Sequence, residues 1–103
     1  MAQTSIKFIP MRSFSAFDLK TEYQPINNTG LEGPLLVLYI TNATNSKVTI
    51  SFDGTTDHAY LLEGQSIVFN SSNSQMPILK AYTQVYVKGP SGVGFVTIFG
   101  YYI

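Results

Sequence analysis

The sequence predicts an all-β fold, an antiparallel β-sandwich of seven or eight strands with Greek-key or jelly-roll-like connections. Three observations predict it. Apolar residues alternate with polar ones or gather in short runs, and no segment has the 3.6-residue spacing of an amphipathic helix. Gly, Pro, Asn, Asp and Ser interrupt these runs at intervals of roughly 8 to 12 residues, as they do between short antiparallel strands. A chain of 103 residues is long enough for one hydrophobic core and one domain, residues 1–103.

The first third of the chain, residues 1–34, is expected to form edge strands of this domain or an extended N-terminal arm. Residues 6–9 read as a strand that ends at Pro10, which has no N–H group for a sheet ladder. A second strand is expected from residue 14 to about residue 23. The stretch "QPINNTGLEGP" that follows is rich in proline and glycine, so it is expected to be a polar loop.

The middle of the chain predicts two strands of different character. The stretch "LLVLYIT", residues 35–41, is apolar on both faces, which places it inside a sheet that a second sheet or another subunit covers on the far side. In residues 47–52 the apolar side chains of Val48, Ile50 and Phe52 share one face, and polar side chains share the other. The Asn-rich turn between the two strands predicts a hairpin.

The rest of the chain predicts further short strands. Residues 59–62 and 66–69 are expected to flank a turn at Glu63 and Gly64, and residues 78–81 to form a short strand or a turn of 3₁₀ helix. The segments "TQVYVKG" and "VGFVTIFGYYI", joined by "GPSG", predict a final hairpin. An aromatic end is unusual for a chain terminus, so the last strand is expected to be paired to its end.

Composition indicates that this domain works in contact with other proteins. The charged fraction is 12%, against roughly 25% in an ordinary globular domain, and 14% of the residues are Phe or Tyr. A small domain has proportionally more surface to cover, so few charges and many rings predict that part of the exterior is buried in a homo-oligomer or a permanent complex.

Charge and hydropathy exclude several function classes. The net charge is zero and basic residues form no cluster, so no binding to nucleic acid is expected. No segment has the roughly 18 apolar residues of a membrane span or the form of a secretory signal, so no membrane contact is expected. The glycosylation-like sequences at Asn27, Asn42 and Asn70 then read as turn chemistry. Without cysteine, thiolate metal sites and disulfides are excluded.

The segment "DGTTDH", residues 53–58, brings Asp53 and Asp57 close to His58, the single histidine. A calcium loop needs alternating ligands, a zinc site needs three or four, and a serine nucleophile elbow is missing. These residue types are also the ones that form a polar turn between two strands. The sequence favours the turn, without catalytic residues, metal or cofactor. A loop-tip ligand site, a pH-sensitive site and an intersubunit metal site built from copies of His58 stay open.

The tyrosines have two possible uses. Packing in the core or at an interface is favoured, because interfaces are enriched in aromatic residues. A platform for stacking sugars, as in carbohydrate-binding modules, stays open. The candidate residues for that platform are Tyr23, Tyr39, Tyr60, Tyr82, Tyr86, Tyr101 and Tyr102.

The stretch "YITNATNSKVTISFDGTTDHAYLLEGQSIVFN", followed by "TQVYVKGPSGVGFVTIFGYY", resembles small virion proteins of tailed bacteriophages. The matching features are a strand, an Asn-rich turn, "VTISFDGTTDH", "VYVKG" and a glycine-containing connection to an aromatic end. The resemblance covers about two thirds of the chain, and residues 1–34 match only loosely. It implies a structural part of the particle and does not give the part's position.

The combined expectation is a non-enzymatic structural component of a bacteriophage virion, assembled in the host cytoplasm as a multi-copy capsid decoration or cement subunit. Its partners would be copies of itself and other virion proteins. The alternatives are a head-to-tail connector, neck or tail-associated subunit, a carbohydrate-binding module used in host attachment, and a small metal-dependent hydrolase. The expected interface residues are Tyr82, Tyr86, Phe95, Phe99, Tyr101 and Tyr102.

Overall fold

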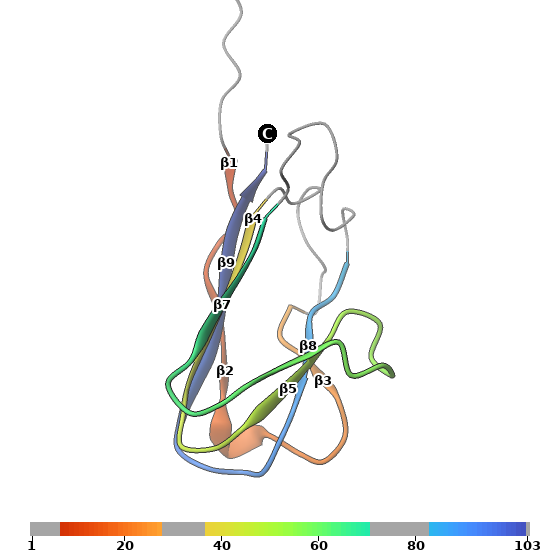
Figure 1. Ribbon diagram of the computed structural model, residues 1–103, viewed down its shortest axis with the longest axis vertical. Coiled ribbons are helices and arrows are strands. Elements are labelled where there is room, and N and C mark those ends of the chain that lie inside the picture. The colour runs from red at the N-terminus through yellow and green to blue at the C-terminus, as the bar shows by residue number, and fades with distance from the viewer. Residues whose placement is uncertain (1–6, 28–36, 71–82, 103) are drawn as a thin grey trace, which may run out of the picture.

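Two antiparallel sheets packed face to face form the fold, which confirms the predicted β-sandwich (Figure 1). The structure is a computed structural model and describes residues 7–27, 37–70 and 83–102. Sheet A contains β1 (Lys7–Phe8), β2 (Arg12–Ser15), β4 (Val37–Thr44), β7 (Ser66–Asn70) and β9 (Gly94–Tyr102). Sheet B contains β3 (Gln24–Pro25), β5 (Val48–Ser51), β6 (Ala59–Leu61) and β8 (Tyr86–Lys88).

The strand order is that of a jelly roll. In sheet A the order is β1 and β2, then β9, β4 and β7, and in sheet B it is β3, β8, β5 and β6. The pairing is therefore nested. β1 and β2 pair with β9, β3 pairs with β8, β4 with β7, and β5 with β6. A long antiparallel ribbon rolled into two layers has this nested pairing. The prediction of a jelly-roll-like sandwich is thus confirmed at the level of topology.

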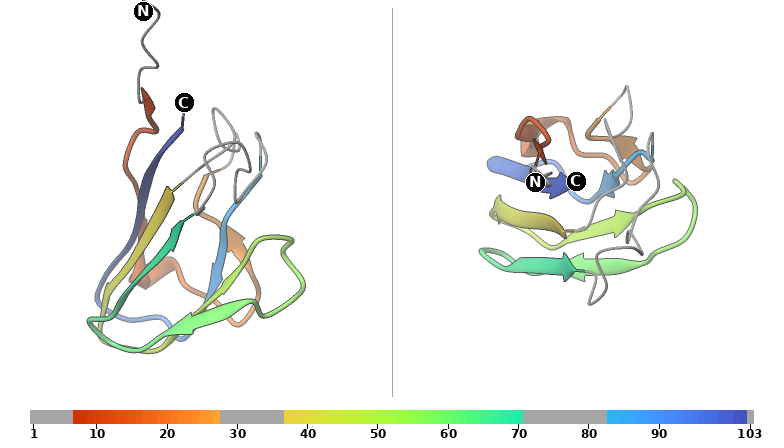
Figure 2. Two further views of the ribbon diagram at one scale, coloured as in Figure 1. Left: turned by 45° about the horizontal axis from the view of Figure 1, so that its top comes forward. Right: turned by 90° about the horizontal axis from the view of Figure 1, so that it is seen from above.

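The N-terminal segment differs from its prediction, and the described residues hold nine strands where the sequence predicted seven or eight. β1 and β2 share one edge of β9 and are separated around Pro10 (Figure 2). The predicted strand 14–23 ends at Ser15, whose hydroxyl accepts a hydrogen bond from the N–H of Phe17 and so begins a 3₁₀ turn, η1 (Ala16–Asp18). The additional strand is β3, which lies in the predicted loop. Residues 78–81 lie outside the described residues.

The two predicted hairpins, β4 with β5 and β8 with β9, are wrong because both connections cross from one sheet to the other. Asn42, on the inner face of β4, is fully buried, and its amide group donates to the carbonyl of Ser46 at 2.8 Å. The same amide donates to the carbonyls of Leu61 and Leu62, beside the crossing from β6 to β7. Turn residues alone do not distinguish a crossing of this kind from a hairpin.

The core lies between the sheets and is built from the alternating inward side chains of both. Sheet A contributes residues such as Leu38, Ile40 and Ile98, and sheet B contributes residues such as Ile50 and Val87, all with no exposed area. This arrangement confirms that β4 lies inside its sheet, between β9 and β7. No helix among the described residues is long and apolar enough to cross a bilayer.

Ending the chain after Gly100 is expected to lower the free energy of unfolding by about 1–2 kcal/mol, because the deletion removes the partners of β1. Tyr101 pairs with Phe8, and their rings meet edge to face with centroids 5.9 Å apart. Urea denaturation of the truncated chain measures the effect. Phe8→Ala serves as a comparison that removes the ring contact and keeps β9 at full length. A truncated chain as stable as the full chain would contradict this expectation.

Candidate functional site

The outer face of sheet A carries four rows of side chains that run across the strands. The registers place Tyr39 beside both Phe99 and Val68, while Phe95 lies beside Ala43 at the other end of the sheet. The Tyr39 and Phe99 rings are stacked, with centroids 4.6 Å apart and planes 8° apart. Stacked or edge-on aromatic pairs gain stability beyond their buried area. Tyr39 and Phe99 therefore present a stacked pair of rings on this face.

A row of hydroxyl groups crosses the sheet between these aromatic rows. The hydroxyl oxygens of Ser13 and Thr97 are 3.1 Å apart, and those of Ser66 and Thr41 are also 3.1 Å apart. The outward residues of sheet A that the structure describes include no Asp, Glu, Lys or Arg. They are Phe8, Ser13, Ser15, Val37, Tyr39, Thr41, Ala43, Ser66, Val68, Asn70, Phe95, Thr97, Phe99 and Tyr101. We call this set the uncharged face.

Three of the predicted interface residues lie on the uncharged face, namely Phe95, Phe99 and Tyr101. Phe95 is 53% exposed and Phe99 39% exposed. Tyr86 does not join them, because it lies in β8 on sheet B and its hydroxyl is bonded to Gln84. Tyr82 lies outside the described residues, and Tyr102 is placed only by its backbone pairing with Lys7.

The sequence interpretation missed Phe8, Tyr39 and Val68 as members of this face. Phe8 is 74% exposed and Val68 47% exposed. The sequence contained a signal for Tyr39. The strand that holds it is apolar on both faces, so both of its faces were expected to be covered by other parts of the protein or by a partner. The inner face of β4 is covered by sheet B. Its outer face carries the buried Val37, the half-buried Tyr39 and Thr41 and the exposed Ala43.

The segment 53–58 connects β5 to β6, and its first carboxylate organises the turn. One carboxylate oxygen of Asp53 accepts hydrogen bonds from the backbone N–H groups of Thr55 and Thr56, both at 2.8 Å. Ser51 donates its hydroxyl to the same oxygen at 2.9 Å, so this buried serine of the predicted polar face has a hydrogen-bond partner in the turn. These hydrogen bonds, led by the one from Thr56, stabilise the charged form and lower the pKa of Asp53.

His58 is also part of the turn. Its ring Nδ1 atom accepts a hydrogen bond from the backbone N–H of Phe52 at 3.0 Å, and the backbone N–H of His58 donates to the carbonyl of Ile50. The lone pair of Nδ1 is therefore engaged and does not serve as a base in this conformation. Nε2 lies 4.0 Å from a carboxylate oxygen of Asp53. The described part of the chain contains no group of three or more His, Cys, Asp or Glu side chains that could hold a metal ion.

Asp57, at the end of the same turn, belongs to a second network on sheet B. The hydroxyl of Tyr23 donates to Asp57, and the ammonium group of Lys88 lies 3.0 Å from the same carboxylate oxygen. Lys88 also lies over the Tyr23 ring, 4.6 Å from its centroid. The Tyr23 hydrogen bond, followed by Lys88, lowers the pKa of Asp57. Burial and the bond to Asp57 raise the pKa of Tyr23.

Stability is expected to fall as the pH drops below about 4, the ordinary range of a carboxyl pKa. The pKa of Asp53 is lower in the folded state than in the unfolded state, so the unfolded chain takes up the proton first. The contribution of Asp53 is thus complete above about pH 4 and is lost as the pH falls toward the folded-state pKa. Urea midpoints measured from about pH 7 to about pH 2 follow this loss.

Asp53→Asn is expected to reduce this acid dependence, because an amide does not titrate, and the part due to Asp57 is expected to remain. Asp18→Asn is the control, since Asp18 lies in η1, away from the turn. The control is expected to keep the wild-type profile. Identical acid profiles for wild type and Asp53→Asn would show that Asp53 does not contribute.

Comparison with known proteins gives no relative for this chain: no family model, curated protein or solved structure matches it.

Proposed function

We propose that this chain is a non-enzymatic structural subunit of a tailed-bacteriophage virion, a multi-copy capsid decoration or cement protein whose copies associate through the uncharged face. The observation that carries the proposal is that face, which combines stacked rings and hydroxyl groups without any described charge. Such a surface remains partly apolar in water unless another protein covers it.

A second copy of the chain is the occupant that this chemistry fits. A surface without charge can meet its own copy without like-charge repulsion, and the chain's net charge of zero adds no long-range repulsion. The hydroxyl row can form hydrogen bonds to the same row of a partner, since a hydroxyl both donates and accepts. Two sheets packed by their faces, about 10 Å apart, form a stable contact when roughly 800 Å² is buried on each partner.

The virion assignment is supported by the sequence resemblance to small phage structural proteins and is compatible with the fold. Jelly rolls occur in viral capsid proteins, and also in lectins and cupins, so the fold alone does not select a function. A non-enzymatic role is supported by the engagement of the acid and histidine side chains of segment 53–58 in turn hydrogen bonds. A connector, neck or tail-associated subunit is the alternative position in the particle.

Sedimentation of the purified chain over a range of concentrations tests the association. The wild type is expected to form a defined oligomer. Phe99→Ser, which removes one ring of the stacked pair, is expected to weaken association by about 10-fold or more. Tyr60→Ser is the matched control, because Tyr60 is 60% exposed but lies on sheet B. A monomeric wild type, or equal effects of both variants, would contradict association through this face.

The position in the particle requires a second experiment. Electron microscopy of the phage with this subunit labelled is expected to place many copies on the capsid surface. A ring of copies at the portal or along the tail would replace the decoration role with the connector or tail role. Complete absence of the protein from purified particles would contradict the virion proposal itself.

A further inference from the structure

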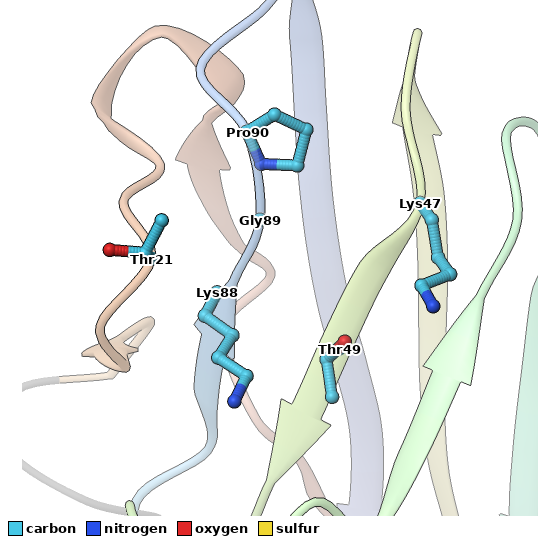
Figure 3. Close-up of a pocket in the computed structure, with 6 residues that line it drawn as sticks. All are labelled: Thr21, Lys47, Thr49, Lys88, Gly89 and Pro90. Carbon is cyan, nitrogen blue, oxygen red and sulfur yellow. The ribbon is translucent and has the colours of Figure 1, made fainter.

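A groove on the outer face of sheet B, on the side of the sandwich away from the uncharged face, has the features of a ligand site (Figure 3). Its volume is about 400 Å³, and its lining residues are Thr21, Lys47, Thr49, Lys88, Gly89 and Pro90. A hollow of about 200 Å³ adjoins it and shares Lys47 and Thr49 with it. Ligand pockets for small molecules are typically about 300–1,000 Å³. The groove is therefore large enough for a single sugar ring.

The strand registers explain why these side chains meet. Thr49 lies in the middle of sheet B, directly opposite Lys88 on one neighbouring strand and Tyr60 on the other. Lys47 precedes β5, and its ammonium group lies 5.2 Å from the centroid of the Tyr60 ring. Figure 3 shows Lys47 and Lys88 on either side of Thr49. A cation, a hydroxyl group and an exposed ring thus lie side by side, with the cation over one face of the ring.

The two lysines are not equivalent. Lys88 is already paired with Asp57 at 3.0 Å and covers the Tyr23 ring. Lys47 is exposed, and no carboxylate in the described part of the chain lies within ion-pair distance of it. Two ammonium groups and one carboxylate leave the groove with one net positive charge. Asp57 forms its ion pair with Lys88 and also feels the charge of Lys47, but Lys47 makes no ion pair with it and keeps hydrogen-bond donors available for an anion.

The neutral groups of the groove are also available to a ligand. The hydroxyls of Thr49 and Thr21 make no hydrogen bond to other residues that the structure describes. The ring of Tyr60 is 60% exposed beside them. An exposed aromatic ring offers a surface to the C–H face of a sugar, and threonine hydroxyls can bond sugar hydroxyls in either direction.

We propose that this groove and the adjoining hollow, which Tyr60 lines, bind a sugar acid, a pyranose that carries a carboxylate. Lys47 contacts the carboxylate, and Thr49 and Tyr60 contact the sugar ring. Each part of such a ligand meets a group that makes no hydrogen bond or ion pair in the described part of the chain, and Lys47 and Tyr60 contact each other. The inference does not depend on the proposed function, because the groove and the uncharged face lie on different sheets. A monomeric protein could bind the sugar, and an oligomer without sugar affinity would leave the structural role intact.

Nuclear magnetic resonance titration of the full chain tests the site. D-glucuronate added up to about 50 mM is expected to shift the amide signals of Thr49, Lys88 and Gly89, with a millimolar dissociation constant. Separate titrations with D-glucose, acetate and inorganic phosphate, at constant ionic strength, are expected to shift these signals much less. The comparison separates recognition of the whole ligand from recognition of a sugar or an anion alone.

Three variants assign the contacts. Lys47→Gln is expected to weaken glucuronate binding about fivefold, the scale of an exposed ion pair, and Lys7→Gln on sheet A is the matched control without effect. Tyr60→Ala is expected to weaken binding of glucuronate and leave the small response to acetate unchanged. Equal binding of glucose, equal binding of acetate or phosphate, an unaffected Lys47→Gln variant, or no shift by about 50 mM glucuronate would each overturn the proposal.

Discussion

Asn42→Ala is expected to lower the free energy of unfolding by about 3–5 kcal/mol, because it leaves several buried polar groups without partners. The Asn42 amide donates to the carbonyls of Ser46, Leu61 and Leu62 at 2.8 to 3.1 Å. Its carbonyl oxygen accepts from the backbone N–H of Thr44 at 3.0 Å. One fully buried side chain thus ties two crossings between the sheets to the same point of β4.

Urea denaturation measures this effect, with Asn70→Ala as the control. Asn70 is exposed at the end of β7, so its replacement is expected to change stability by about 0.5 kcal/mol or less. Asn42→Asp gives a second measurement, because aspartate keeps the shape and the acceptor but loses the amide donors. We expect Asn42→Asp to be destabilised as well. A loss in Asn42→Ala no larger than in Asn70→Ala would show that these hydrogen bonds contribute little.

Gly94→Ala is expected to destabilise the protein by about 3 kcal/mol or more, because the first residue of β9 has no room for a side chain. A Cβ atom at Gly94 would lie 2.0 Å from the carbonyl oxygen of Ala43 and 2.9 Å from the Cα atom of Thr44. The φ angle of Gly94 is +104°, which side chains disfavour in any case. Relief of the overlap would move β9 away from β4 along their shared ladder.

Gly64→Ala separates the backbone effect from the steric effect. Gly64 has a φ angle of +77°, but a Cβ atom there would meet no atom within 4 Å. We expect it to cost only about 1–2 kcal/mol, the penalty of the left-handed backbone. Thermal or urea unfolding of both variants gives the comparison. Equal losses in the two variants would show that β9 shifts easily and that the close approach is not a constraint.

The strands were predictable from sequence where the side-chain pattern reports directly on burial. The alternation at Val48 and Ile50 identified β5, and the apolar character of both faces identified β4 as an interior strand. The layer that a strand joins was not predictable, since the turn residues after β4 suit both a hairpin and a crossing. Asn42 stabilises the crossing through its hydrogen bonds. Two of its partners, Leu61 and Leu62, lie far from it in the sequence, so the local pattern does not reveal these bonds.

The candidate sites were predictable to a smaller extent. Phe95 and Phe99 alternate along one strand, so the sequence placed them together. Tyr39 comes beside Phe99 only through the pairing of β4 with β9. The groove on sheet B depends on the pairing of β5 with β8, which brings Thr49 opposite Lys88. Both sites depend on pairings between strands that are distant in the sequence. Local residue patterns do not predict such pairings.

The nested pairing of the jelly roll also predicts an order in which the strand pairs of this chain form. Among the described strands, β5 and β6 form the one ladder between consecutive strands, so this ladder closes with the smallest loss of chain entropy. Each further pair joins segments that are farther apart, which makes folding slow for a domain of this size. The Asp53 turn therefore lies at the expected starting point, and the termini join last.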